Sequence, residues 1–161
     1  MIIVSNTSPL SSLAKIDRLN LLEEIYHNII IPQAVYDELI DIKAGKKINN
    51  TIKNANWIQI RAITNKQLVS KLEHNLDRGE AEAITLSVEL KANLLLIDER
   101  LGRREANQLG LTVTGVLGVL LIAKKRGLIN QVKVVMDELI LQTTFRVSSK
   151  LYDHILKEVN E

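Results

Sequence analysis

The sequence predicts an α/β protein built around one open, mostly parallel sheet. Short runs of β-branched and aliphatic residues alternate with longer segments whose apolar residues recur with helical spacing. This alternation is typical of β-α units, in which a helix connects one parallel strand to the next. The chain has 161 residues, of which 46% are apolar and only 3% are aromatic. We therefore expect a single domain, residues 1–161, with an aliphatic core.

The expected strands are short and apolar, and lie at residues 1–5, 28–31, 57–60, 94–97 and 111–114. The expected helices cover residues 10–26, a segment that starts at Pro32, and residues 65–76, 80–90, 100–109, 116–125, 132–141 and 149–159. Residues 41–56 mix lysine with asparagine and glycine, which indicates an exposed segment, part helix and part loop. The last two helices form a helical C-terminal extension at about 130–161.

Composition and charge narrow the function classes. The net charge of +2 is too small to indicate nucleic-acid binding by itself, so an electrostatic argument needs local clusters. The chain contains no cysteine, which excludes disulfides and thiolate metal sites. No apolar run approaches the length that spans a membrane, and the N-terminus has no signal-peptide pattern. We expect a cytoplasmic protein.

The run DRGEAEAI at residues 77–84 has two interpretations. Asp77 is a favourable N-cap residue, and an acid in a first helical turn interacts well with the helix dipole. Alternatively, a helix start holds carboxylates rigidly enough to bind a hard divalent cation. Glu80 and Glu82 are two residues apart and point about 200° away from each other on a helix. Glu80 is therefore the stronger candidate ligand of the two.

Other polar residues are expected, like Glu80, near the carboxyl ends of the strands. Ligands of open α/β sheets bind beyond the carboxyl ends of the strands. Asn6 follows the first strand and Asp98 follows the strand at 94–97, while Glu38 and Glu80 are expected in early helical turns. Carboxylates held close together repel one another unless protons or a cation neutralise them. Mg²⁺ or Mn²⁺ is the simplest such cation, although Glu38 taken alone also fits a solvated helix residue.

These residues lie in motifs that resemble PIN-domain nucleases, in particular a prokaryotic branch of PIN-like proteins. The motifs are VSNTSP at 4–9, IPQAVYDEL at 31–39, GEAEAI at 79–84, LLLID at 94–98 and GVLG at 115–118. The resemblance extends from residue 1 to about residue 128. It implies a Rossmann-like, three-layer α/β/α domain and a ribonuclease activity that depends on Mg²⁺ or Mn²⁺. It also suggests a toxin that acts beside a small antitoxin protein, often as a homodimer.

The family's four acidic positions fall on Asn6, Glu38, Glu80 and Asp98 in this chain. Glu82 and Glu99 are auxiliary candidates for metal binding. Asn6 departs from the family pattern, because most PIN nucleases have an aspartate there. An amide oxygen still binds a hard cation but brings no negative charge, so metal affinity should fall.

Basic and hydroxyl residues beside these acids are candidates for RNA contacts. Arg100, Arg103 and Arg104 follow Asp98 in one helix and are placed to bind phosphates; a solvated helix face is an equal alternative. Ser8, like its neighbour Thr7, is placed either to hold a phosphate or a metal-bound water, or to cap the first helix.

Two functions are compatible with these residues and motifs. One is a metal-dependent endoribonuclease that cleaves RNA phosphodiester bonds. The alternative is a catalytically weakened PIN-like domain that binds RNA or a protein without cutting, which Asn6 favours. A nucleotide-binding Rossmann domain is disfavoured, because no Gly-x-Gly-x-x-Gly loop follows the first strand.

Overall fold

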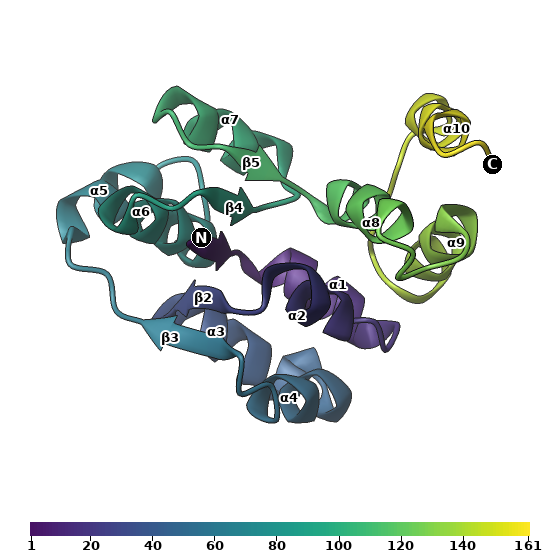
Figure 1. Ribbon diagram of the computed structural model, residues 1–161. Helices are drawn as coiled ribbons and strands as arrows, with labels where there is room; N and C mark the ends of the chain where they lie inside the picture. Colours follow the sequence, from purple (N-terminus) through teal and green to yellow (C-terminus); the bar gives the residue numbers. More distant parts are fainter.

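The protein contains a five-stranded parallel sheet flanked by ten α-helices (Figure 1). The predicted α/β fold with a parallel sheet is thus confirmed. The computed structural model describes residues 1–161. The strands follow the order β3-β2-β1-β4-β5, and every neighbouring pair is parallel. They are β1 (Ile3–Ser5), β2 (Ile29–Pro32), β3 (Ile58–Arg61), β4 (Leu94–Leu96) and β5 (Val113–Thr114).

The central strands are apolar because helices cover the sheet. In β1 and β4, Val4 and Leu96 are fully buried, and the two strands pair with Val4 opposite Leu95. A strand buried on both sides needs a continuous apolar sequence, which explains why these runs do not alternate. β3 lies at the edge of the sheet and is largely exposed, so Ile60 is one of the few large apolar residues at the surface.

The ten α-helices connect and cover the strands. They are α1 (Thr7–Lys15), α2 (Asn20–Tyr26), α3 (Gln33–Ile40), α4 (Lys46–Lys53), α5 (Lys66–Leu72), α6 (Arg78–Leu90), α7 (Arg100–Gln108), α8 (Val116–Lys125), α9 (Val132–Gln142) and α10 (Ser149–Glu158). A short 3₁₀ helix covers Ile42–Ala44. Helix α6 packs against β1, β2 and β4, whereas α2 packs against β2 and α8 against β5.

The first helical segment differs from the prediction. Instead of one helix over residues 10–26, the structure has α1 and α2, separated at residues 16–19. Asp17 adopts a positive φ of 59°, which ends α1 and turns the chain. Apolar residues continue through the break, with Ile16 and Leu19 buried, so the apolar pattern alone did not reveal it.

The core is one continuous apolar cluster of 37 buried residues. It includes Val132, Val135 and Leu139 of α9 and Ile155 of α10, so the C-terminal helices pack on the same core as the sheet. In Figure 1, α8, α9 and α10 gather at the right-hand side of the molecule. None of the helices combines the length and the apolar character needed to cross a membrane.

Replacing a buried leucine of β4 should destabilise the protein strongly. Leu96 is fully buried, so we expect Leu96→Ala to lower the free energy of unfolding by about 2–5 kcal/mol. Leu141 in α9 is 84% exposed and serves as the matched control, with an expected change within about 0.5 kcal/mol. Urea denaturation measures both values. Similar losses for the two variants would contradict the assignment of β4 to the core.

Candidate metal centre

A cavity of about 310 Å³ lies where β1 passes into α1, at the carboxyl edge of the sheet. Three of the four predicted ligands, Asn6, Glu38 and Glu80, line this cavity together with Glu99. No apolar residue is among its lining side chains. We call this space the acidic cavity.

Asn6 is fixed by the backbone and leaves its side-chain oxygen unused. Its N–H donates a hydrogen bond of 2.9 Å to the Leu96 carbonyl oxygen at the end of β4. The residue is only 4% exposed, and its Oδ1 is buried without a hydrogen-bond partner. A buried oxygen without a partner is costly, and a bound ligand would remove that cost. Asn6 is therefore the clearest indication that the acidic cavity binds something.

Thr7 and Ser8 orient acidic side chains and do not cap α1. The α1 N-terminus has no side-chain cap. The Thr7 hydroxyl donates to Glu38 Oε2, and the Ser8 hydroxyl donates to Asp98 Oδ2 at 3.4 Å. The first turn of α1 thus contacts two acids that are far apart in the sequence.

Glu38 lies later in its helix than predicted, in the second half of α3. It faces the start of α6, where its carboxylate lies directly against Gly79. Partial loss of water raises the pKa of Glu38, and the nearby Asp77 and Glu82 charges add to this shift. Hydrogen bonds from Thr7 and from the Gly79 backbone oppose it.

Glu80 lies in the first turn of α6, as predicted, and forms a capping box with Asp77. Its N–H donates to Asp77 Oδ1 at 2.8 Å, and Asp77 N–H donates to Glu80 Oε1 at 3.2 Å. Glu80 Oε2 has no such bond. The residue is 7% exposed, and burial raises the pKa of Glu80 to about 7. The negative charges of Asp77 and Glu99 add to this increase, whereas the hydrogen bond from the Asp77 backbone N–H opposes it.

Asp98 does not line the acidic cavity. It follows β4, as predicted, but lines two adjoining cavities. The Val116 N–H at the start of α8 donates to Asp98 Oδ1 at 2.8 Å, so this carboxylate holds a helix N-terminus. Burial raises the pKa of Asp98, while the bonds from Val116 and Ser8 and the Arg103 charge lower it. No three acidic or histidine side chains are grouped closely enough to form a ready metal site.

The two auxiliary candidates differ. Glu82 is 5% exposed and does not line the acidic cavity; it accepts a hydrogen bond from the Ala34 N–H at 3.1 Å and pairs with Arg78 at 3.0 Å. This placement does not support a role for Glu82 as a ligand. Glu99 is exposed, has no ion-pair partner, and lines both the acidic cavity and the cavities beside Asp98.

A glycine lies against each of the three family acids. A Cβ atom at Gly79 would collide with the Glu38 carboxylate, and one at Gly115 would lie 2.5 Å from Asp98 Oδ1. At Gly102 it would lie 3.2 Å from Glu80 Oε2 and 2.6 Å from a side-chain carbon of Ile97. The positions of these carboxylates therefore depend on the absence of side chains opposite them.

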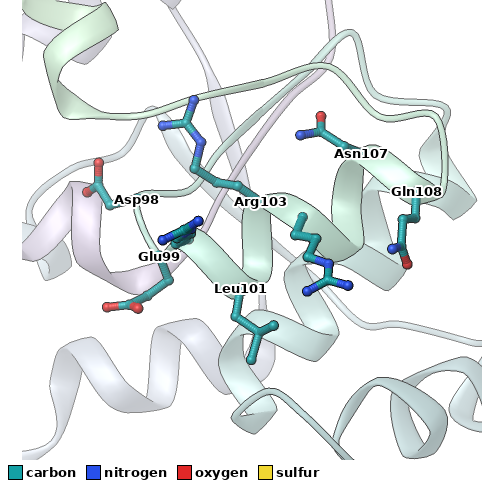
Figure 2. A pocket seen from close by; sticks show the side chains of 8 residues that line it. Asp98, Glu99, Leu101, Arg103, Asn107 and Gln108 are labelled. Carbon is teal, nitrogen blue, oxygen red and sulfur yellow. The ribbon is translucent and has the colours of Figure 1, made fainter.

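A larger cavity of about 1040 Å³ runs along α7. Figure 2 shows Asp98 and Glu99 at the start of this helix and Asn107 and Gln108 at its end, with Arg103 between them. The other predicted arginines, Arg100 and Arg104, also line it; both are exposed, and neither forms an ion pair. Exposed arginines without ion-pair partners fit both the solvated helix face and the phosphate-binding surface that the sequence allows.

Sequence reasoning missed several residues of the acidic cavity. Lys15, Ser11 and Ser12 line it from α1, and Thr143 and Thr144 line it from the loop between α9 and α10. The α1 residues share one helix face with Ser8 at spacings of three, four and seven, so helical periodicity could have found them. Nothing in the periodicity places a loop 137 residues or more from Asn6 beside it.

The donor set of the acidic cavity fits a hard divalent cation. Carboxylate oxygens and an amide oxygen are the ligands that Mg²⁺ and Mn²⁺ prefer. Asn6, whose Oδ1 has no hydrogen-bond partner, lines the same cavity as the carboxylate residues Glu38 and Glu80. Mg²⁺ usually keeps several waters and needs only one or two carboxylates, which suits a site with few direct ligands.

Comparison with known proteins identifies the family. A PIN-domain family matches residues 2–161, almost the whole chain. The chain belongs to the PIN-domain family. This PIN domain resembles the structure of a PilT N-terminus domain protein from the hyperthermophilic archaeon Sulfolobus solfataricus, with a TM-score of 0.54 and 21% identity over 76% of this chain and 93% of that one. That similarity concerns the fold alone. No curated protein matches the chain.

The raised pKa of Glu80 should make the stability of this PIN domain depend on pH. The folded protein holds the Glu80 proton more tightly than the unfolded chain does, because the pKa rises from 4.5 to about 7. Protonation therefore stabilises the fold as the pH falls from 8 toward 4.5, and this contribution is lost as the pH rises through 7. Glu80→Gln removes the titrating group but keeps a residue suited to the capping box.

We expect the free energy of unfolding of the wild type minus that of Glu80→Gln to fall between pH 5 and pH 8. Urea denaturation in EDTA at several pH values measures this difference. A difference that does not change with pH would contradict the assigned environment of Glu80.

Proposed function

We propose that this PIN domain is a metal-dependent endoribonuclease, with Mg²⁺ or Mn²⁺ held in the acidic cavity. The main support is the Asn6 side-chain oxygen, which is buried without a partner in the same cavity as Glu38 and Glu80. The family gives the chain a nuclease-type fold. The raised pKa values of Glu38 and Glu80 indicate carboxylates that a cation would stabilise in their charged form.

The residues of the chain have distinct roles in this proposal. Asn6, Glu38 and Glu80 would hold the ion, and the Thr7 hydroxyl orients Glu38. When bound, the metal would activate water and stabilise negative charge on the phosphate. Asp98 holds the start of α8 and the first turn of α1 through Val116 and Ser8, so it fixes the wall beside the site.

The cavity along α7 supplies the contacts to the RNA strand. Arg100 and Arg104 have no acidic partners, and a guanidinium group binds phosphate oxygens through paired hydrogen bonds. Glu99 lines both this cavity and the acidic cavity, so the two spaces adjoin. A strand on the arginines thus has a phosphate within reach of the acids.

The second candidate is a PIN domain that binds RNA or a protein without cleaving. Two observations favour it: Asn6 brings no negative charge, and no three acids are grouped closely. Cleavage by Asn6→Asp but not by the wild type would support this candidate.

Asn6→Asp should couple stability to metal binding. In EDTA the variant buries a carboxylate in place of an amide, so we expect a lower melting temperature than in the wild type. We expect Mn²⁺ to reverse this loss and to bind at least about tenfold more tightly, which corresponds to about 1.4 kcal/mol. Calorimetry measures both effects. Asn56→Asp, an exposed residue, makes the same charge change away from the cavity as a control. Equal responses of the two variants to Mn²⁺ would exclude Asn6 from the metal site.

Glu80→Gln should abolish cleavage while keeping the fold. We expect single-stranded RNA to be cut by the wild type with Mn²⁺ and the rate to fall at least about 100-fold in this variant. Asp98 is a poor choice for this test, because its replacement also removes the hydrogen bond that Asp98 accepts from the Val116 N–H at the start of α8. The measurement is product formation on a denaturing gel, with circular dichroism as the control for folding. Wild-type rates in Glu80→Gln would contradict the proposal.

A further inference from the structure

The acidic cavity also contains polar side chains that the metal centre does not use. Ser12, Lys15 and Thr144 all line the cavity, and none of their side chains forms a hydrogen bond or ion pair. By contrast, the hydroxyls of Thr7, Ser8 and Ser11 each donate a hydrogen bond. Lys15 and Thr144 are exposed, and none of the three donors has a partner within the protein, so all three are free to bind a ligand that accepts hydrogen bonds.

Ser12 is the most informative of the three. It is only 7% exposed and yet lines both the acidic cavity and the cavity beside Asp98. A serine inside a helix often bonds to a carbonyl oxygen of the preceding turn, as Ser11 does to Ser8. Ser12 makes no such bond. Its hydroxyl is therefore not held by another group of the protein and is available to the cavity.

Lys15 is the only cation that lines the acidic cavity. It ends α1, and its carbonyl oxygen accepts a hydrogen bond of 2.8 Å from the Lys47 ammonium group, which fixes the end of the helix. Lys15 lies seven residues after Ser8, about 10 Å along the helix axis. It is thus separated from the Asp98 end of the helix and presents a free positive charge.

The chemistry of these three side chains favours a phosphate as the ligand. Hydroxyl donors and an ammonium group bind phosphate oxygens, whereas base recognition needs aromatic surfaces or paired amide groups, and none of the residues lining this cavity is aromatic or apolar. Contacts to phosphate do not depend on the base.

We propose that Ser12, Lys15 and Thr144 form a phosphate subsite that binds the backbone of single-stranded RNA on one side of the metal centre, opposite the α7 arginines. This inference rests on the proposed nuclease function for its substrate. The RNA strand then passes from the arginines, across the acids, to Lys15. The loop between α9 and α10 contributes Thr144, so the C-terminal extension is part of the substrate site.

The test measures binding of a fluorescein-labelled oligouridylate of about twelve nucleotides to the full chain in EDTA. EDTA removes divalent cations and so prevents metal-dependent cleavage. Lys15→Ala should weaken binding about three- to tenfold and reduce the slope of log affinity against log salt by about 0.7, the value for one phosphate contact on a single strand. Lys15→Arg should restore both. Lys71→Ala, an exposed lysine that lines none of these cavities, should leave both unchanged.

The hydroxyl variants separate binding from folding. Ser12→Ala and Thr144→Val remove hydroxyls that make no hydrogen bond, so melting temperatures should stay within about 2 °C while affinity falls about two- to fivefold. The fold-loss for each variant should be the same for oligoadenylate.

Wild-type affinity and salt slope in Lys15→Ala, or a loss that depends on the base, would overturn the subsite. Failure of the wild type to bind would overturn it too. Cleavage with Mn²⁺ is scored on the same samples. If the wild type cleaves RNA and Lys15→Ala binds RNA as the wild type does, the subsite is wrong and the nuclease function stands. If Lys15→Ala weakens binding and the wild type does not cleave, the subsite is supported and the nuclease function is contradicted.

Discussion

The hydrogen bond between the Asn6 N–H and the Leu96 carbonyl oxygen fixes the place where the site is built. It joins the ends of β1 and β4, so α1 must begin beside the end of β4. From that starting point, Thr7 reaches Glu38 and Ser8 reaches Asp98. The acidic cavity therefore follows from the pairing of β1 with β4 inside the sheet.

Charge is arranged unevenly around this point. Asp98 accepts hydrogen bonds from the Val116 N–H and the Ser8 hydroxyl, although burial still raises its pKa, and Glu82 pairs with Arg78, so these acids have partners within the protein. Glu80 is buried and Glu38 is exposed, yet both carboxylates lose part of their water and have acidic neighbours, and these two effects raise both pKa values. Groups that the fold leaves poorly satisfied are the ones that a ligand can satisfy, and this distinguishes the cavity from an ordinary ion-pair network.

The sequence was sufficient for the succession of strands and of most helices along the chain and for the placement of Asn6 and Glu80, because short apolar runs and a helix N-cap are local signals. The opposite directions of Glu80 and Glu82 also followed from the helical rotation of about 100° per residue. The separate place of Asp98 did not follow, since it depends on the start of α8 coming close enough to donate a hydrogen bond. The contribution of Thr144 depends on how a distant loop packs, which no periodicity encodes.

The contacts between glycines and acids restrict how this chain can change over time. Because the Glu38 carboxylate occupies the space where a Gly79 side chain would be, a methyl group at position 79 requires a shorter acid at position 38. The same reciprocity holds for Gly115 and Asp98, where the acid is already the shorter of the two kinds. Positions 38 and 79 should therefore vary jointly among relatives, whereas position 115 should stay glycine because no shorter acid can replace Asp98.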